Sequence, residues 1–496
     1  MKISYESYKD KVKACWIGKN IGGTMGTPYE GKRELLDVKG FASKPGEPLP
    51  NDDLDLQLVW LYALENIGPA NITGEALGEF WLNFIPPHWN EYGIGKANML
   101  RGLVPPTSGD WENDWKHSNG AWIRTEIWAC TAPAIPELAV KYAVADAKVD
   151  HGTGEGTYAA AFVAAMQSSA FALDSLYQCI EAGLCAIPAE SRVAKSVSKV
   201  LECYKDGKSW VDARNAVLEM NSDIGNGWFE APSNVAYAIL GMVYGEGDFK
   251  KSMLIAINCG DDTDCTGATV GSTMGILYGT KGIPSDWAEY IGDKIITVSL
   301  INDGCGARVP KSCTELTERV IAIAPSVMYS HNGKNDNRGN DKLMTVFGEP
   351  DTTAEQNLDT LKDRIKRYVP EQVLCYGENA IEFAKGPFAG SLSVSSLNIE
   401  PFGEITVKLD IRLMTYLQPK QYPLKLNWLV PEGFTVDGPK NGFLKRYERH
   451  THGTGHFKAE FTVTAPEYLN DTERLVLEIT SPGRHTSIYV PVVLLP

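Results

Sequence analysis

The hydrophobic pattern of this chain changes its period once along the sequence, and this change is the strongest limit on how the chain can fold. Before about residue 325, apolar residues recur at helical spacing, as Leu54, Leu58 and Leu61 do on one face of 54–65. Beyond about Ile381, apolar and polar residues alternate, which is typical of half-buried strands. The 496 residues are also too many for one ordinary core, so we expect two domains.

The earlier part, residues 1–330, is predicted to be a mainly α-helical domain. Residues 159–176 are rich in alanine and predict a helix, whereas residues 92–119 are rich in glycine and proline and predict a long loop. Small residues dominate 267–278 (GATVGSTMGILY). A helix of such residues can approach neighbouring backbones closely, so we expect this one to be central.

The later part is predicted to contain a linker and a second domain. Residues 331–380 form the expected linker, with a polar start and one helix at 353–368. In residues 381–496, short alternating runs are separated by turn residues, which favours an all-β sandwich as an accessory domain. The strands are expected at 392–397, 405–411, 422–428, 457–463, 475–479 and 487–495.

Charge and composition exclude some classes of partner and indicate a compartment. The net charge of −15 argues against a basic surface for nucleic acid and against attraction to an anionic membrane. No apolar run approaches the length of a membrane-spanning helix. Residues 1–16 lack the apolar stretch of a secretory signal, and the ten cysteines form no Cys-x-x-Cys pair, so we predict a cytoplasmic protein with free thiols. A secreted protein whose signal peptide had been removed would look the same.

Two short acidic stretches, 51–55 (NDDLD) and 261–264 (DDTD), point to a binding site. Each directly precedes a run that reads as an apolar helix. If the fold brings both helix starts together, several carboxylates meet at a partly buried point, and they require a positive partner there. A hard divalent cation with oxygen ligands is the natural partner. Capping of the two helices by Asn and Asp is the alternative explanation.

Five segments in this order resemble the motifs of a known family. They are 22–30 (GGTMGTPYE), 51–53 (NDD), 119–121 (NGA) with Arg124 following, His151 before a helix, and 260–265 (GDDTDC) with a small-residue helix ending at 277–279 (LYG). The family is that of the ADP-ribosylglycohydrolases, which includes the dinitrogenase reductase-activating glycohydrolases. The resemblance covers residues 10 to 285.

The resemblance implies an all-α domain that holds two Mg²⁺ ions, or Mn²⁺ ions, between two helix starts. Glu30 falls where family members carry a substrate-side carboxylate, and Glu30 and Asp53 are the expected catalytic acids. The implied metal ligands are Asn51, Asp52, Asp53, Asp262, Asp264 and Cys265.

Three positions depart from the family pattern. Gly23 stands where the family has Asp, and Asn51 and Cys265 stand where it has Thr. The amide oxygen of Asn51 can still bind a metal ion. The sulfur of Cys265 suits a hard ion poorly, which leaves open how the second ion is bound.

The expected substrate contacts lie mostly between the two acidic stretches. Six of the twelve tryptophans fall within 48 residues there, and aromatic faces can stack on bases and sugar rings, although packing of these side chains onto the core is an equally good explanation. Asn119 and Gly120 match the family motif, and His151 could contact a diphosphate or serve as a structural hydrogen-bonding group. The predicted substrate-binding residues are Asn119, Gly120, Trp122, His151 and Trp111.

Three functional interpretations follow. The first is a metal-dependent glycohydrolase that cleaves an N- or O-glycosidic bond to ADP-ribose or a similar ribosyl group, with a small-molecule or ADP-ribosylated substrate. The second keeps this chemistry but acts on another carbohydrate or nucleoside, which a β-sandwich module would accompany by analogy. The third is a non-catalytic binding protein on the same scaffold. The retained acids argue against the third, because buried carboxylates cost stability unless they bind something.

Overall fold

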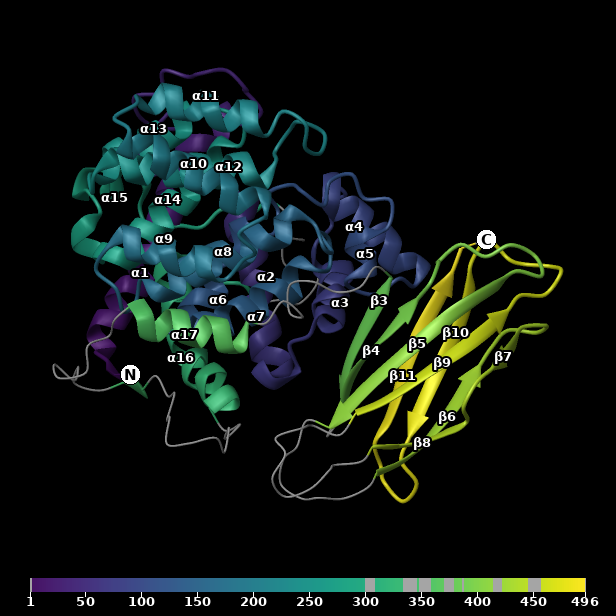
Figure 1. Ribbon diagram of the computed structural model, residues 1–496. Coiled ribbons are helices and arrows are strands. Elements are labelled where there is room, and N and C mark those ends of the chain that lie inside the picture. The colour runs from purple at the N-terminus through teal and green to yellow at the C-terminus, as the bar shows by residue number, and fades with distance from the viewer. Residues whose placement is uncertain are drawn as a thin grey trace. The chain divides into compact units, whose positions relative to one another are not determined.

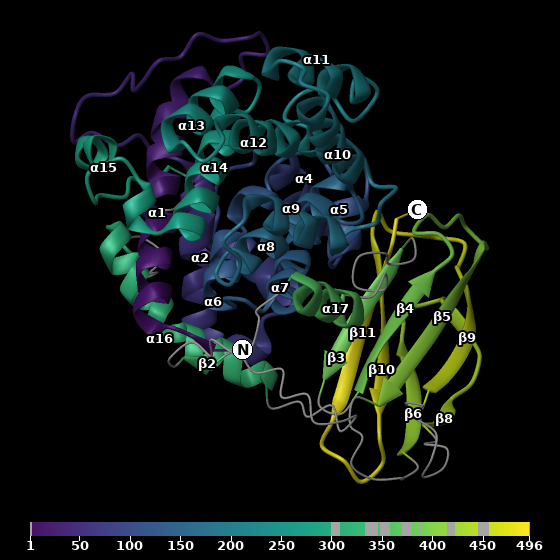
Figure 2. The same ribbon diagram turned by 60° about the vertical axis from the view of Figure 1, so that its left-hand side comes forward.

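The computed structural model describes residues 2–298, 308–332, 346–347, 358–369, 379–385, 388–413, 422–444 and 456–495. The chain divides into two compact units. The first consists of Met1–Gly93 and Glu112–Cys375, and the second of Ile94–Trp111 and Tyr376–Pro496. Figures 1 and 2 show that the first unit is built from helices and the second mainly from strands. The predicted fold class, a helical domain followed by a β-sandwich, is confirmed.

The first unit is a bundle of α-helices and short 3₁₀ turns, with one small pair of parallel strands, β1 (Lys2–Ile3) and β2 (Val346–Phe347). Six of the described helices follow a Ser, Thr, Asn or Asp N-cap residue whose side chain accepts a hydrogen bond from an amide of the first turn. The helices are α1 (Tyr5–Gly26), α2 (Asp52–Ile67), α3 (Gly74–Phe84), α6 (Glu126–Thr131), α7 (Pro136–Ala147), α8 (Glu155–Ser169), α9 (Leu176–Cys185), α10 (Arg192–Lys205), α11 (Trp210–Met220), α12 (Ala231–Gly245), α13 (Phe249–Asn258), α14 (Thr263–Tyr278), α15 (Ser285–Ile291), α16 (Cys313–Asn332) and α17 (Leu358–Tyr368).

Glycines hold α1 and α14 against each other at the centre of this unit. A Cβ atom at Gly22 would lie 2.0 Å from the carbonyl oxygen of Gly267, and one at Gly18 would lie 2.1 Å from that of Gly271. The same close approach continues at Gly26, whose Cβ would lie 2.2 Å from the carbonyl oxygen of Thr263. The two helices therefore run antiparallel in backbone contact, as the small residues of 267–278 predicted. The end of α1 is fixed beside the start of α14.

Two helical predictions differ from the structure. The helix expected over 159–176 ends at Ser169, because residues 170–175 form an irregular turn, and α9 begins at Leu176 after the N-cap residue Ser175. The loop expected over 92–119 is wrong for its first part, which is helix α4 (Asn90–Arg101), and a short helix α5 (Thr107–Asp110) follows. Good helix formers at 96–100 outweigh Gly93 and Gly95 there. The predicted helix at 353–368 is present as α17 from Leu358, and residues 353–357 lie outside the described residues.

The second unit contains two antiparallel sheets that share one apolar core. The sheets have strand orders β11-β10-β6-β8 and β3-β4-β5-β9-β7. All six predicted strands are present, as β4, β5, β6, β9, β10 and β11. The strands are β3 (Ala380–Lys385), β4 (Phe388–Val394), β5 (Glu404–Leu413), β6 (Tyr422–Leu429), β7 (Thr435–Asp437), β8 (Asn441–Leu444), β9 (His456–Thr464), β10 (Glu473–Thr480) and β11 (Ser487–Leu494). Residues 94–111 join this unit through a small cluster in which Trp111 packs with Leu103, Leu397 and Val493.

Two of the composition-based expectations concern features that the structure can show. None of the described helices is both long and apolar enough to cross a membrane. The eight cysteines within the described residues are all free thiols, and seven of them are buried. Cys305 and Cys375 lie outside the described residues.

Candidate metal centre

The two acidic stretches meet at the starts of α2 and α14. Asp52 and Asp53 occupy the first turn of α2, Asp262 is the N-terminal cap of α14, and Asp264 lies in the first turn of α14. A helix N-terminus presents unpaired amide groups and a positive partial charge, both of which favour carboxylates. The packing of Gly26 against the start of α14 also brings Glu30 to this point, and Thr263 Oγ donates to the Gly26 carbonyl at 2.8 Å.

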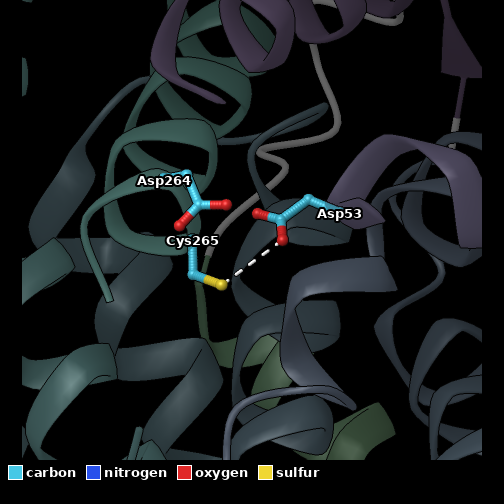
Figure 3. Close-up of side chains that lie close together, drawn as sticks. All are labelled: Asp53, Asp264 and Cys265. Atoms are coloured by element: carbon cyan, nitrogen blue, oxygen red, sulfur yellow. Dashed lines mark hydrogen bonds between the residues drawn. The ribbon is translucent and has the colours of Figure 1, made fainter. Parts of the chain in front are cut away.

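These side chains form two groups that could each hold a metal ion, and the groups share Asp264. One contains Glu30, Asp262 and Asp264, and the other contains Asp53, Asp264 and Cys265. Within each group the possible ligand atoms lie within 4.8 Å of one another. Figure 3 shows Asp53 directed from α2 toward Asp264 and Cys265 on α14. The sequence-predicted ligands Asp53, Asp262, Asp264 and Cys265 are thus brought together, along with Glu30.

Several oxygens of this cluster are buried without a hydrogen-bond partner. They are Asp53 Oδ2, Asp262 Oδ1 and Asp264 Oδ1. A buried carboxylate oxygen that accepts nothing costs free energy, so each such atom in a folded protein calls for a partner. A cation bound among these oxygens would supply it. Oxygen donors at this density suit a hard ion such as Mg²⁺ or Mn²⁺.

The mutual repulsion of the carboxylates leads to the same conclusion. The charge of Asp264 raises the pKa of Glu30 to about 8, with a further contribution from burial. Burial, and then Asp264, raises the pKa of Asp52 to about 6. The pKa values of Asp53 and Asp262 are raised well above the usual range, mainly because these carboxyls are buried. A positive charge in the cluster would restore the ionised forms.

A buried lysine lies behind Asp53 and was not identified from the sequence. Lys19 of α1 is completely buried, with its Nζ 3.9 Å from Asp53 Oδ2 and 3.2 Å from Glu126 Oε1. It also donates to the Ile123 carbonyl at 2.7 Å. Burial opposes its charge, but Glu126 and Asp53 raise the pKa of Lys19. Its position inside an otherwise apolar helix face, between Trp16 and Ile21, was the available signal.

Glu126 belongs to a buried network that satisfies its carboxylate fully. Gln57 Nε2 donates to Glu126 Oε2 at 2.7 Å, and Ser272 Oγ donates to Glu126 Oε1 at 2.7 Å. Gln167 Nε2 donates to the same Oε1 at 3.1 Å. Five helices contribute side chains to this network: α1, α2, α6, α8 and α14. Their hydrogen bonds hold Lys19 and Glu126 in place next to Asp53.

Asn51 and Asp52 make contacts other than those of the two groups. Asn51 caps α2 by accepting from the Asp53 amide through Oδ1 at 2.7 Å. Its Nδ2 occupies the space above Gly23, where a Cβ would lie 1.8 Å away. The departures at positions 23 and 51 are therefore spatially linked, since the Asn51 amide fits only beside a glycine. Asp52 Oδ2 accepts from the hydroxyl of Tyr92 at 3.0 Å.

Asn119 and Gly120 of the Asn-Gly motif donate hydrogen bonds to carboxylates in and near the cluster. Asn119 Nδ2 donates to Asp262 Oδ2 at 2.7 Å, and Trp122 Nε1 donates to Asn119 Oδ1 at 2.9 Å. The Gly120 amide donates to Glu91 Oε1 at 3.1 Å. Trp122 is completely buried, so its ring faces are covered and its indole acts on the site by orienting Asn119. Glu91 was not identified from the sequence.

His151 is also fully buried, within a charged network. Its Nδ1 lies 2.8 Å from Asp150 Oδ1 and its Nε2 lies 3.3 Å from Ser118 Oγ. Arg124 forms ion pairs with Asp146 and Asp150 at 3.0 and 2.7 Å. The substrate role predicted for His151 is not tested by this arrangement. Trp111, the other predicted substrate contact, lies in the second unit.

An exposed aromatic residue lies on a loop that is tied to the cluster. The Phe229 amide donates to Asp261 Oδ1 at 3.3 Å, and Asn234 Nδ2 donates to Asp261 Oδ2 at 3.1 Å. The neighbouring Trp228 is 42% exposed, and the guanidinium of Arg33 lies 4.9 Å from its ring centre. Arg33 itself follows Glu30 by three residues. Within the described residues, the pair is connected to the acidic cluster only through its chain neighbours Phe229 and Glu30, and its aromatic ring is a possible stacking surface.

Comparison with known proteins assigns the helical unit. The sequence profile of the ADP-ribosylglycohydrolase family matches residues 4–318, which is more than half of the chain. The chain belongs to the ADP-ribosylglycohydrolase family. The resemblance found in the five motifs is thus confirmed, and both acidic stretches lie within the range that matches the family. The strands of the second unit lie outside it.

Individual proteins give shorter or weaker matches. The chain is similar to the ADP-ribosylarginine hydrolase Tri1 of Pseudomonas putida (strain GB-1), at 39% identity over 54 residues. This match spans 11% of the chain and only 15% of that relative's length. A solved ADP-ribosylglycohydrolase-related protein complex matches with a TM-score of 0.43 and 20% identity, covering 65% of this chain and 100% of that one. A FixG-related protein from Vibrio parahaemolyticus matches with a TM-score of 0.18 and 12% identity, covering 22% and 97%.

Proposed function

We propose that this chain is a metal-dependent glycohydrolase that cleaves an N- or O-glycosidic bond to ADP-ribose or a similar ribosyl group. The observation that carries the proposal is the set of buried oxygens on Asp53, Asp262 and Asp264 that accept no hydrogen bond, between two helix N-termini of a domain that belongs to the ADP-ribosylglycohydrolase family. These three residues and Glu30 would hold Mg²⁺, or Mn²⁺ as the second choice. A bound ion would supply ligand positions for ribose hydroxyls and lower the pKa of a bound water.

Other side chains would handle the proton, stabilise the transition state and orient the metal ligands. Glu30 lies at the exposed edge of the cluster, where a substrate can reach its carboxyl group. Its raised pKa suits it to hold or release a proton during cleavage, and as a carboxylate it would stabilise an oxocarbenium-like transition state. Lys19 lies near Asp53 Oδ2, and Cys265 Sγ donates to Asp53 Oδ1. These two contacts fix the orientation of the Asp53 carboxylate. Asn119 does the same for Asp262.

The proposed substrate class rests on the exposed pair Trp228 and Arg33 and on the relatives of the chain. Trp228 with Arg33 offers a face for a nucleobase and a positive charge for a phosphate, which fits a nucleoside diphosphate sugar. The Pseudomonas relative is named as an ADP-ribosylarginine hydrolase, so an ADP-ribosylated arginine is the first substrate to test. The β-sandwich outside the family match favours the second candidate, a glycohydrolase acting on another carbohydrate or nucleoside. We place the protein in the cytoplasm, and its ligand partners would be small molecules or ADP-ribosylated proteins.

The test is the release of ADP-ribose from an ADP-ribosylated arginine peptide by the full chain, with Mg²⁺, with Mn²⁺ and with chelator. The double variant Asp262→Ala, Asp264→Ala should lose metal binding and release. A matched double variant on the sandwich surface, Asp437→Ala with Asp471→Ala, should keep both. Unchanged release in the first variant, or no release by the unaltered chain with either metal ion, would contradict the proposal. Release from another ribosyl compound alone would favour the second candidate.

A further inference from the structure

The two groups of possible ligands in the cluster differ in chemistry. Glu30, Asp262 and Asp264 offer carboxylate oxygens alone, whereas the group of Asp53 and Asp264 also contains the sulfur of Cys265. Carboxylate oxygens suit Mg²⁺ and Mn²⁺, and thiolates favour softer ions such as Zn²⁺ and Co²⁺. The shared Asp264 makes the two positions adjacent. They are therefore not equivalent places for the same ion.

The thiol of Cys265 is placed as a ligand rather than as a packing group. It lies in the first turn of α14, is buried, and its Sγ is 3.3 Å from Asp53 Oδ1. Figure 3 shows the sulfur directed toward the Asp53 carboxylate. Asp53 Oδ2 and Asp264 Oδ1 of the same group have no hydrogen-bond partner. The sulfur therefore lies beside two buried carboxylate oxygens that accept no hydrogen bond.

The charge of Lys19 lies beside this position, and it also acts on Asp264, which both groups share. Its Nζ lies 3.9 Å from Asp53 Oδ2, and none of the contacts described for Lys19 involves Glu30 or Asp262. A positive charge beside a metal position weakens the binding of a further cation. A strong metal–sulfur bond would offset that repulsion, and only an ion that bonds well to sulfur gains from it. A hard ion bonds weakly to sulfur and would have no such gain.

We propose that Asp53, Asp264 and Cys265 form a thiolate-containing subsite that takes a softer divalent ion such as Zn²⁺ or Co²⁺, while Glu30, Asp262 and Asp264 take Mg²⁺ or Mn²⁺. On binding, the metal–sulfur bond forms as the S–H bond breaks, and the proton leaves to solvent. The subsite belongs to the metal centre of the proposed function, so it deepens that proposal and rests on it. The resulting centre is mixed, with one hard and one softer ion.

The experiment titrates Co²⁺ into the metal-free full chain in the presence of saturating Mg²⁺ and records the near-ultraviolet absorbance. We expect a thiolate-to-Co²⁺ charge-transfer band that saturates with one equivalent of Co²⁺. Cys265→Thr should lose the band and weaken Co²⁺ binding by more than about ten-fold. Cys259→Ser is the matched control, because Cys259 is an equally buried thiol that donates to the Ile255 carbonyl instead, and this variant should keep the band.

The absence of the band in the unaltered chain, or its persistence in Cys265→Thr, would overturn the inference. The outcome is separable from that of the proposed function. Release of ADP-ribose by a chain without the band would refute the thiolate subsite alone. A band in a chain that releases nothing from any ribosyl substrate would refute the function and leave the subsite standing.

Discussion

The cores of the two units are built on opposite principles. The sandwich core consists of Leu, Ile, Val, Phe and Ala side chains, and Glu473 and Ser481 are the buried polar residues within the described part of 379–495. The helical unit instead buries many charged side chains, among them Lys19, Asp53, Arg124, Glu126, Asp146, Asp150, His151, Asp262 and Asp264. Buried charges oppose folding unless something binds them. The difference indicates that the sandwich is organised for stability and the helical unit for a bound ligand.

The largest effect should follow from removing the buried cation of the helical unit. Lys19→Met leaves Glu126 and Asp53 as uncompensated buried charges, so we expect a loss of about 3–5 kcal/mol in the free energy of unfolding. Urea unfolding measures it. The matched variant in the sandwich is Lys408→Met, whose ion pair with Glu460 is exposed, and it should cost less than about 1 kcal/mol. Equal losses in the two variants would break the comparison.

The stability of the metal-free helical unit should fall as pH rises. Asp52 has its pKa raised from 3.8 to about 6, so the unfolded chain releases the proton before the folded chain does. The stability present at about pH 4 is thus lost progressively up to about pH 6, by at most about 3 kcal/mol for this group. Glu30, with a pKa of about 8, extends the decline toward about pH 8.

Thermal unfolding in chelator between these pH values measures the decline, and added Mg²⁺ should remove most of it, because the ion restores the ionised carboxylates. In the sandwich, burial opposes the ionisation of Asp410, but hydrogen bonds with His456 and Lys458 lower its pKa, so this group gives no such decline. A metal-free protein whose helical unit becomes more stable as pH rises would contradict the account of the cluster.

A side chain added at the contact of α1 with α14 should destabilise the helical unit. Gly22→Ala places a Cβ about 2.0 Å from the Gly267 carbonyl oxygen, so the helices must separate, and we expect a loss of about 1–3 kcal/mol. Metal affinity should fall as well, since Glu30 and Asp264 are held together by this contact. Gly40→Ala is the control, because nothing lies within 4 Å of a Cβ there, and it should change stability by less than about 0.5 kcal/mol. Calorimetry and Mg²⁺ titration of both variants provide the measurement.

The smallest effect on stability should come from the rim. Trp228→Ala removes an exposed ring and should change the free energy of unfolding by less than about 0.5 kcal/mol. If the ring stacks on the substrate, KM should rise about two- to ten-fold with little change in kcat. Tyr468→Ala removes an exposed ring from the sandwich and should leave KM unchanged. An unchanged KM in Trp228→Ala would exclude the stacking role.

Periodicity was sufficient to predict most of the architecture. The change from helical to alternating spacing gave both classes of unit, and the small residues of 267–278 gave the central helix because their effect depends only on local shape. The helix α4 was missed, since Gly93 and Gly95 suggested a loop while the residues at 96–100 favoured a helix. The assignment of residues 94–111 to the sandwich unit depends on contacts distant in sequence, such as Trp111 with Val493, which no local pattern contains.

The acidic cluster was visible in the sequence, but its surroundings were not. Asp53 and Asp264 were identified because each stands at a helix start beside other acids. Lys19 and Glu91 were missed because nothing local shows that they reach this cluster from other helices. Trp122 was expected at the substrate; it is completely buried and its indole donates to Asn119, and a substrate contact for it stays a prediction. Sequence motifs therefore indicated which residues gather in the cluster better than the direction in which each side chain points.

The most direct test of the central claim, that the acidic cluster binds a divalent cation, is the thermal unfolding of the full chain with and without Mg²⁺. Mg²⁺ at about one hundred times its dissociation constant should stabilise the unaltered chain by about 2.7 kcal/mol. The variant Asp262→Ala, Asp264→Ala should show no stabilisation at the same concentration. An unaltered chain whose unfolding is indifferent to Mg²⁺ and Mn²⁺, or a double variant that is stabilised equally, would contradict the claim.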